Sequence, residues 1–260
     1  MWDTEIIMTI PRGAVAPRKR RESTAEWVQS HLGFVPDAAQ TRVLNSKNKR
    51  VLLNCSRQWG KSTVTAARAV YQAQHEAGSL TLVVSPSERQ SGEFLRKAAG
   101  FVRRLGVRTK GDGDNELSLA FPNGSRIVGL PGSEATIRGF SAVSLLLVDE
   151  AARVSDELYL SIRPMLAVSN GALWLMSTPF GKRGFFHKEW EGGKGWERLR
   201  VTGYECPRIS PEFLDEERTT MGERWFGQEY LCEFTDVCSG MFDGDLVERA
   251  VSEELAVLAI

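Results

Sequence analysis

Short runs of apolar residues recur along the middle of the chain, and polar residues do not alternate with the apolar ones inside them. Each run has the length of a β-strand, and the missing alternation indicates that both faces of the strand are covered. The runs lie at residues 51–53, 80–84, 143–148 and 172–176, with one more candidate strand at residues 198–202. This pattern predicts a mostly parallel sheet with helices on both faces.

Segments with helical character fill the intervals between these runs. They lie at residues 62–77, 87–105 and 156–166, and later in the chain at residues 211–219 and 223–231. The first two segments stop at Gly78 and Gly106, and glycine commonly follows the last turn of a helix. Strands that alternate with helices in this way predict β-α-β units and a doubly wound α/β fold.

One segment interrupts the alternation of strands and helices. Leu117, Leu119 and Phe121 alternate with polar residues, residues 122–124 form a Pro-Asn-Gly turn, and the apolar pattern returns at residues 127–128. Two short strands joined by such a turn are typical of an antiparallel hairpin. We therefore expect a β-hairpin inserted on the sheet.

The two ends of the chain differ from the middle. A short amphipathic stretch at residues 25–32 precedes the first strand, and a last one at residues 245–258 follows a turn at residues 238–240. We expect one domain over residues 1–240, with a core at about 30–203 and a small lid subdomain at about 204–235. Residues 241–260 are expected to form a connector helix.

Composition and charge limit the class of protein. The 260 residues suffice for one large α/β domain, and 42% hydrophobic with 25% charged residues is typical of a globular protein. Basic and acidic residues number 33 each, so any contact with DNA must come from local patches. The one obvious patch, the basic residues 18–21, is interpreted as a solvated tail, and an arm that contacts phosphates is the alternative. The four cysteines and three histidines have no zinc-ligand spacing.

No apolar stretch approaches the length of about 18 residues that a membrane helix needs, which predicts a soluble, cytoplasmic protein.

A candidate phosphate-binding loop lies between the first strand and the first long helix. Gly60 lets backbone N–H groups approach phosphates, Lys61 offers a cation to the β- and γ-phosphate oxygens, and Ser62 offers a hydroxyl ligand for Mg²⁺. The strict pattern has glycine where this chain has Cys55, and an ordinary helix start with a lysine is the alternative. The residues expected to contact the nucleotide are Ser56, Arg57, Gln58, Trp59, Gly60, Lys61, Ser62 and Thr63.

A second half-site follows the strand at residues 143–148. Four apolar residues lead directly into Asp149 and Glu150, a pattern that arises by chance in about one chain in a hundred of this length. Ligands bind at the carboxyl ends of parallel strands, where Asp149 would hold Mg²⁺ and Glu150 would deprotonate the attacking water. The alternative is a surface Asp-Glu pair at a helix start. Together with the loop, the pair predicts hydrolysis of ATP.

The loop and the acidic pair, in this order, resemble the ATPase domain of the large terminase subunit, the DNA-packaging motor of tailed bacteriophages and prophages. The likeness covers roughly residues 30–245, and the family commonly has Arg-Gln before x-Gly-Lys with its first glycine relaxed, as in residues 57–61. The resemblance implies a P-loop NTPase fold and an ATPase that drives double-stranded DNA into a procapsid. It also implies partners: a portal protein, a small terminase subunit and further copies of the chain in a ring.

Further residues match family motifs. Residues 34–36 and Gln40 resemble the adenine-reading segment, since a glutamine amide pairs with the adenine edge; a helix start with Gln40 on its surface is the alternative. Ser177 and Thr178 resemble the coupling motif, in which hydroxyls sense the γ-phosphate; a turn that caps the next helix is the alternative. These likenesses predict a preference for ATP and a link from hydrolysis to movement.

Two arginines are candidates for the cation that phosphoryl transfer requires on the γ-phosphate. Arg57 lies inside the loop and would act within its own subunit. Arg138 resembles the position from which some terminases reach into the neighbouring site, and a surface or DNA-contacting arginine is the alternative. We favour the role of Arg138 in trans, which would require an assembled ring.

Complete large terminases continue into a nuclease domain, and we expect no nuclease activity in this polypeptide. Asp243, Asp245 and Glu248 are interpreted as an acidic helix start, not as a metal cluster. A superfamily 2 helicase or translocase is the first competing interpretation, but it needs a second RecA-like domain, and some 26 residues remain after Phe234. An inactive nucleotide-binding remnant of a prophage is the second.

Overall fold

The structure is a computed structural model that describes residues 22–112, 115–131 and 139–236. Within them lies a single mixed sheet of eight strands in the order β3-β4-β5-β2-β6-β7-β1-β8. The strands are β1 (Arg50–Cys55), β2 (Leu80–Ser85), β3 (Lys110–Asp112), β4 (Asn115–Ala120), β5 (Arg126–Pro131), β6 (Leu145–Asp149), β7 (Ala172–Ser177) and β8 (Glu197–Val201). All neighbours from β5 to β8 in this order are parallel. The sequence pattern thus located the strands of the parallel core.

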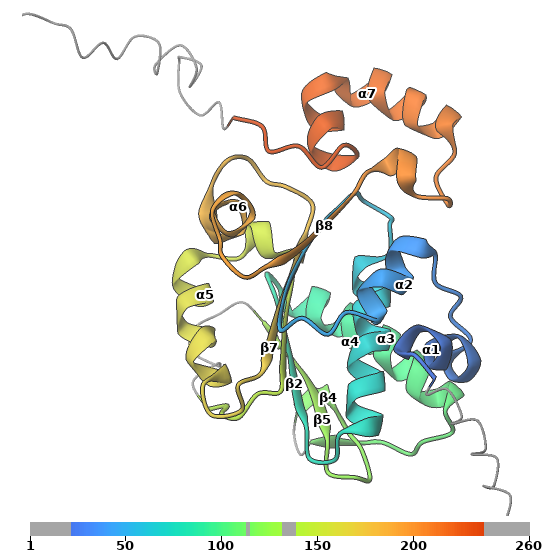
Figure 1. Cartoon of the computed structure of the whole chain (residues 1–260), viewed down its shortest axis with the longest axis vertical. Coiled ribbons are helices and arrows are strands. Elements are labelled where there is room, and N and C mark those ends of the chain that lie inside the picture. The colour runs from blue at the N-terminus through green and yellow to red at the C-terminus, as the bar shows by residue number, and fades with distance from the viewer. Residues whose placement is uncertain (1–21, 113–114, 132–138, 237–260) are drawn as a thin grey trace, which may run out of the picture.

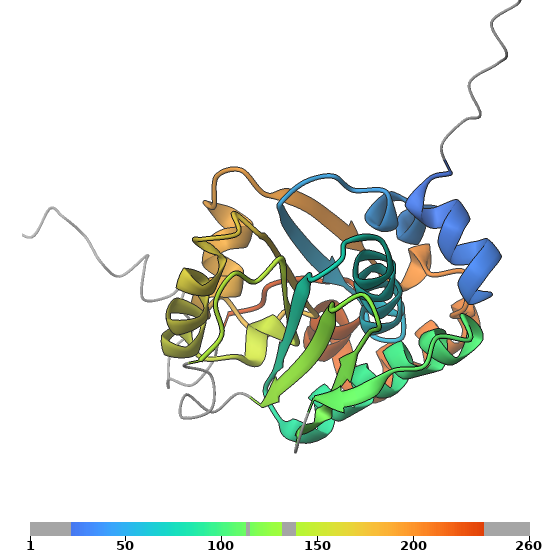
Figure 2. The ribbon, with the colours of Figure 1, turned by 90° about the horizontal axis from the view of Figure 1, so that it is seen from below.

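Two helical layers cover the sheet, as Figures 1 and 2 show. One layer consists of α1 (Thr24–Leu32), α2 (Ala38–Leu44), α3 (Lys61–His75) and α4 (Glu88–Arg104), and the other of α5 (Asp156–Ile162) and α6 (Gly184–Glu191). Each layer packs its apolar side chains on one face of the central strands, so two separate hydrophobic clusters form. Because both faces are buried, the central strands carry the continuous apolar runs seen in the sequence.

The predicted hairpin extends the sheet at one side. Strand β4 pairs antiparallel with β5, while β5 itself lies parallel to β2. The short strand β3, which the sequence pattern did not predict, pairs antiparallel with β4. The fold is therefore the predicted α/β arrangement with one antiparallel addition.

The last described helix, α7 (Pro211–Glu229), lies across the carboxyl ends of the parallel strands (Figure 1). Gly222 breaks it with φ 76°, where the sequence predicts two helical segments. Leu214, Phe226 and Tyr230 form a small apolar cluster of their own. This separate cluster fits the predicted lid, whose limits remain a prediction.

One helical prediction needed correction in detail, and one helix was missed. The segment at 156–166 is α-helical only to Ile162 and continues as a 3₁₀ turn from Arg163 to Leu166. Pro164 lacks the N–H that an α-helix would need there. Helix α6 was not predicted, because its two buried residues, Phe185 and Phe186, are adjacent and give no helical period.

Candidate nucleotide site

The predicted phosphate loop connects the carboxyl end of β1 to the start of α3. Gly60 takes φ 97° at the N-cap of α3, and no side chain caps this helix. A side chain at this φ would be strained, so glycine is required here. The first N–H groups of α3 are therefore left for a ligand, and their dipole favours an anion.

Cys55 ends β1 and explains why the first glycine of the strict pattern is dispensable. The residue pairs in register with Val201 of β8, and its side chain is fully buried. It is not among the residues with positive φ, so the backbone makes no demand for glycine. Burial raises the pKa of the thiol well above its usual range, although nearby Lys61 opposes the shift. The cysteine is a packed, inert residue at this position.

Lys61 and Ser62 occupy the first turn of α3. Lys61 is 7% exposed, and its Nζ donates to the carbonyl oxygens of Cys55 and Ser56 at 2.9 and 3.1 Å. Ser62 Oγ donates to Asp149 Oδ2 at 2.8 Å. The structure thus brings together the two halves of the predicted site, which lie 87 positions apart in the sequence.

The acidic pair at the end of β6 has two different environments. Asp149 is 5% exposed, and burial, followed by the charge of Glu150, raises the pKa of its carboxyl group. The hydrogen bond from Ser62 and the charge of Lys61 oppose that rise. Glu150 is more exposed and has φ 50°. A left-handed glutamate costs about 1–3 kcal/mol, and such outliers cluster at functional sites.

The orientation of Glu150 depends on the turn that follows β6. Strand β6 ends at Asp149, so the alternation of side chains along a strand does not extend to Glu150. Glu150 is the N-cap of a 3₁₀ turn from Ala151 to Arg153, and its backbone N–H donates to Asp149 Oδ1 at 3.1 Å. The left-handed turn, not the strand, orients this carboxylate.

The tip of the loop is anchored through the carbonyl oxygen of Trp59. Gln40 Nε2 donates to it at 2.9 Å, and Arg208 Nη2 donates at 2.5 Å. Arg208 also pairs with Asp37, the N-cap of α2, at 3.0 Å. This network joins the loop, α2 and the segment that leads into α7.

Gln40 has a structural task in this arrangement. Its Oε1 accepts from the backbone N–H of Asp37 at 3.1 Å in a capping box, and the residue is 1% exposed. A helix does start at Asp37, as the alternative interpretation held, but Gln40 is buried and not on the helix surface. One amide hydrogen remains without a described acceptor, and contact with adenine stays a prediction.

Arg57 makes an ion pair that the sequence did not predict. Its Nε lies 2.5 Å from Glu229 Oε2 at the end of α7, and its backbone N–H donates to the Glu229 carbonyl oxygen at 3.0 Å. Arg153 Nη2 lies 3.5 Å from the other oxygen of Glu229 and its Nε 4.0 Å from Glu150. Glu229 thus connects the loop, the turn after β6 and α7. No local motif marks Glu229 or Arg153, because only the fold brings them here.

The predicted coupling residues lie at the end of β7, beside β1. Ser177 is fully buried and Thr178 is 2% exposed. Four of the buried polar atoms that have no hydrogen-bond partner among the described residues lie at this edge of the sheet; they are Asn54 Oδ1, Ser56 Oγ, Ser85 Oγ and Ser177 Oγ. Buried polar groups almost always have partners, so this group indicates a place where ligand or water oxygens bind. That chemistry fits a nucleotide.

A cavity of about 200 Å³ lies over the loop, lined by Arg57, Gln58, Gly60, Lys61, Ser62, Lys97 and Glu150. Lys97 comes from α4 and was not predicted as a site residue. No hydrogen bond or ion pair engages its ammonium group within the described parts of the chain. The loop cavity therefore contains a cation that is available to an anionic ligand.

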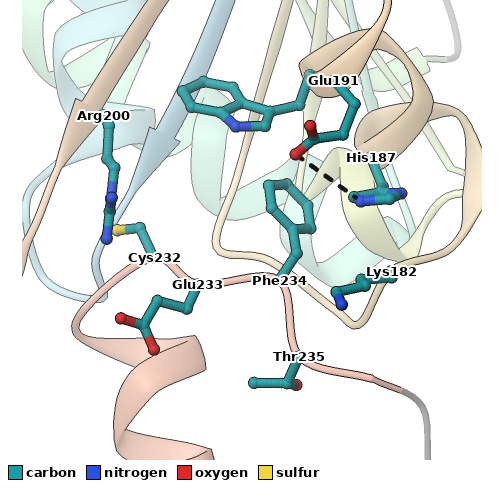
Figure 3. A pocket seen from close by; sticks show the side chains of 9 residues that line it. Lys182, His187, Glu191, Arg200, Cys232, Glu233, Phe234 and Thr235 are labelled. Atoms are coloured by element: carbon teal, nitrogen blue, oxygen red, sulfur yellow. Dashed lines mark ion pairs between the residues drawn. The ribbon is translucent and has the colours of Figure 1, made fainter. Parts of the chain in front are cut away.

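A larger cavity, about 690 Å³, lies away from the loop (Figure 3). Its walls come from α6, β8 and the segment after α7, and Phe234 projects between His187 and the acidic Glu233. His187 Nε2 lies 4.0 Å from Glu191 Oε1. No residue of the phosphate loop lines this cavity, so size alone does not locate the nucleotide site.

Several predicted positions lie outside the described residues. They are Arg138, the basic residues 18–21, the acidic residues 243, 245 and 248, and the connector helix. Within the described residues, no group of three or more His, Cys, Asp or Glu side chains has a metal-binding arrangement. No helix in this part of the chain has the length and apolar character to cross a membrane.

A parallel sheet, a loop that ends at the start of α3 and an acidic pair on a neighbouring strand define the P-loop NTPase class. Residues 52–249 match the family model of the terminase large subunit, T4likevirus-type, N-terminal. This match covers most of the chain, and the protein belongs to that family.

Individual relatives agree with the family match. The large terminase subunit of Escherichia phage T5 is 23% identical over 224 residues, which cover 81% of this chain and 50% of the phage protein. The large terminase ATPase domain of Thermus phage P74-26 has a TM-score of 0.73 at 22% identity and covers 83% of this chain and all of that domain. The large terminase of another thermophilic bacteriophage, solved in complex with ATP-gamma-S, has a TM-score of 0.63 at 16% identity, with 76% of this chain and 52% of that protein covered. The chain spans about half the length of the curated relatives it matches.

Proposed function

We propose that this domain binds ATP with Mg²⁺ at the carboxyl edge of the sheet and hydrolyses it, and that this hydrolysis drives double-stranded DNA into a phage procapsid. The contact of 2.8 Å between Ser62 and Asp149, beside Lys61 at the free start of α3, carries the proposal. The thermophilic phage terminase that has been solved with ATP-gamma-S supports the choice of nucleotide. A phosphate-release assay with Mg²⁺, with and without duplex DNA, tests it.

Phosphate binding would use groups that are already in place. The N–H groups at the start of α3, which no side chain caps, would face the phosphates, as at other helix starts that bind anions. Lys61 would exchange the carbonyl oxygens of Cys55 and Ser56 for phosphate oxygens, which are stronger acceptors for an ammonium group. Lys97 would add a second cation from α4.

Ser62 and Asp149 fit a Mg²⁺ site because both offer oxygen atoms, the ligands that this ion prefers. Their direct hydrogen bond of 2.8 Å supports a common ion, which both oxygen atoms would contact once the hydroxyl hydrogen turns away. When bound, Mg²⁺ neutralises charge that develops on the phosphates. Phosphate and water oxygens would complete its coordination, as is usual for Mg²⁺ with nucleotides.

Glu150 would position the attacking water and accept its proton. Its carboxylate lies one residue beyond the Mg²⁺ ligand Asp149 and lines the cavity over the loop. The left-handed turn fixes its backbone before the substrate binds. Arg153, at 4.0 Å, would limit the rotation of the carboxylate. A carboxylate in this place would act as a general base.

The ion pair between Arg57 and Glu229 would couple the nucleotide to the lid, which we place at about residues 204–235. A γ-phosphate would compete with Glu229 for Arg57, so that binding loosens the end of α7 and hydrolysis restores the pair. Ser177 and Thr178, at the end of β7, would report the same event to the segment that follows them. The position of the lid would then depend on whether the γ-phosphate is present.

We expect the Glu229→Gln variant to bind ATP up to about fivefold more tightly, because Arg57 no longer has a charged competitor for the phosphate. Calorimetry with an unhydrolysed ATP analogue measures the change. The Glu223→Gln variant alters an exposed carboxylate on the same helix that pairs with Arg218, away from the loop; it is the control and should leave affinity unchanged. Weaker binding by Glu229→Gln would contradict the competition.

Arg138 would complete the site of a neighbouring subunit in a ring, as the resemblance implies. We expect Arg138→Ala to reduce ATP turnover at least about a hundredfold and to leave nucleotide binding intact, because the arginine meets charge only in the transition state. Parallel measurements of turnover and affinity test this expectation. Equal turnover by the variant and the parent protein would refute a role in trans.

The portal protein, the small terminase subunit and duplex DNA are proposed partners, by membership of the family. A helicase-like translocase would separate strands, whereas a packaging motor would show ATPase activity stimulated by duplex DNA without strand separation. An inactive remnant would release no phosphate under any of these conditions. One assay series therefore distinguishes the three interpretations.

A further inference from the structure

A second polar cavity, of about 360 Å³, lies at the opposite edge of the sheet from the phosphate loop. It is lined by the residues that lead into β1, β6 and β7, including Lys47, Lys49, Ser144 and Gly171, and by the C-terminal half of α3. Since α3 rises about 1.5 Å per residue, Arg68 lies roughly 10 Å along the helix from Lys61. This cavity is therefore separate from the proposed nucleotide site.

Arg68 is the central feature of the cavity. No described residue forms a hydrogen bond or an ion pair with its guanidinium group, and its Nε is buried without an acceptor. Its described contacts are the rings of Tyr71 and Trp174, at 5.6 and 5.7 Å from Cζ. A guanidinium group presents five N–H donors, and burying even one of them without an acceptor is costly. The group therefore has donors left for a hydrogen-bonded anion.

Trp174 gives an independent indication of a ligand. Its side chain is 1% exposed, it lines the same cavity, and its indole Nε1 has no acceptor among the described residues. A buried indole N–H normally finds a partner. Two different residues, one on α3 and one on β7, thus offer unsatisfied donors at one cavity.

The charges around the cavity favour a small anion. Lys47 and Lys49 are exposed at its rim and join Arg68 as cations, whereas Glu76 is the only carboxylate among the lining residues. Glu76 already accepts from Gln72 Nε2 at 2.9 Å, and it acts on Arg68 through its charge without an ion pair between the two described side chains. The carboxylate at the rim disfavours a rigid polyanion such as duplex DNA, whereas a flexible acidic peptide can insert one carboxylate and keep its other charges near the lysines.

We propose that this cavity binds an acidic side chain of a partner protein, with Arg68 and the indole N–H of Trp174 as its donors. A guanidinium group fits a carboxylate through two parallel hydrogen bonds. The lysines at the rim then attract the acidic segment that carries this side chain and raise its rate of association. Because α3 also carries Lys61 and Ser62, such a partner would hold the far end of the helix that starts the phosphate site.

Titration of the ¹⁵N-labelled protein with a penta-glutamate peptide at low ionic strength tests the proposal. We expect the indole N–H resonance of Trp174, identified by its loss in Trp174→Phe, to shift in a saturable way. Arg68→Gln should weaken the peptide affinity about tenfold or more, because it removes a charged hydrogen-bond donor. Lys47→Gln, on the exposed rim, should weaken the peptide affinity by a smaller factor. This variant also tests the proposal if Arg68→Gln does not fold.

Controls separate the outcomes. Arg96→Gln, an exposed arginine of α4 that pairs with Glu93, should behave as the parent protein. Inorganic phosphate and a duplex DNA oligonucleotide are titrated in parallel at the same ionic strength. No shift with the peptide, or an unchanged affinity in both the Arg68 and Lys47 variants, would overturn the proposal. So would a Trp174 indole shift that saturates at lower concentrations of phosphate or DNA than of the peptide. The Lys61→Ala variant should keep the Trp174 indole shift with the peptide. A failure of the proposed nucleotide site can therefore be distinguished from a failure of this cavity to bind the peptide.

Discussion

Lys61→Ala is expected to weaken ATP binding by about tenfold to a hundredfold and to reduce turnover about a thousandfold. Lys61 is 7% exposed beside the loop, and in the proposed complex the hydrogen bonds of its ammonium group pass from two carbonyl oxygens to the phosphates. A hydrogen bond to a charged group contributes about 1.5–3 kcal/mol, which corresponds to this loss of affinity. The larger loss of turnover follows because charge grows on the phosphates in the transition state.

Calorimetry with an ATP analogue and steady-state phosphate release measure the two quantities. Lys194→Ala, which removes a lysine outside the site, is the control and should change neither. The proposed role of Lys61 is wrong if its alanine variant binds and hydrolyses ATP as the control does.

Glu150→Gln is expected to reduce turnover by about 10²- to 10⁴-fold while ATP affinity stays within about threefold of the parent value. The amide has nearly the shape of the carboxylate, but it cannot accept the proton of the attacking water, and loss of a general base has effects of this size. Single-turnover hydrolysis measures the chemical step separately from product release.

Glu157→Gln is a matched control, since Glu157 is a carboxylate in the first turn of α5 and does not line the cavity over the loop. A Glu150→Gln variant that keeps full turnover would assign the base to another group. Equal losses of binding and turnover would assign Glu150 a role in nucleotide binding.

The sequence was most informative where one physical requirement determines which type of residue can occupy a position. The buried strands of the parallel core were recognisable because both of their faces are covered, and Gly60 was recognisable because its φ of 97° excludes other residues. Ser62 and Asp149 were paired by the rule that the carboxyl ends of parallel strands lie at one edge of the sheet. Their contact depends on the parallel arrangement of the strands, which the apolar pattern predicted.

The sequence was least informative where function depends on contacts between distant segments. Glu229 comes from α7 and reaches the loop only because this helix crosses the ends of the strands. Lys97 looks like any exposed lysine of an amphipathic helix, and its place over the loop follows from the packing of α4 on α3. The sequence placed Glu150 directly after the strand, as the structure does, but no feature of the residue pattern predicts its left-handed backbone conformation.

A crystal structure of the domain with Mg²⁺ and ATP-gamma-S tests the central claim most directly. The account predicts one triphosphate over the start of α3, with Lys61 Nζ on its phosphate oxygens and a single Mg²⁺ bound to Ser62 and Asp149. A nucleotide bound at another place, or a Mg²⁺ held without Ser62 and Asp149, would contradict it.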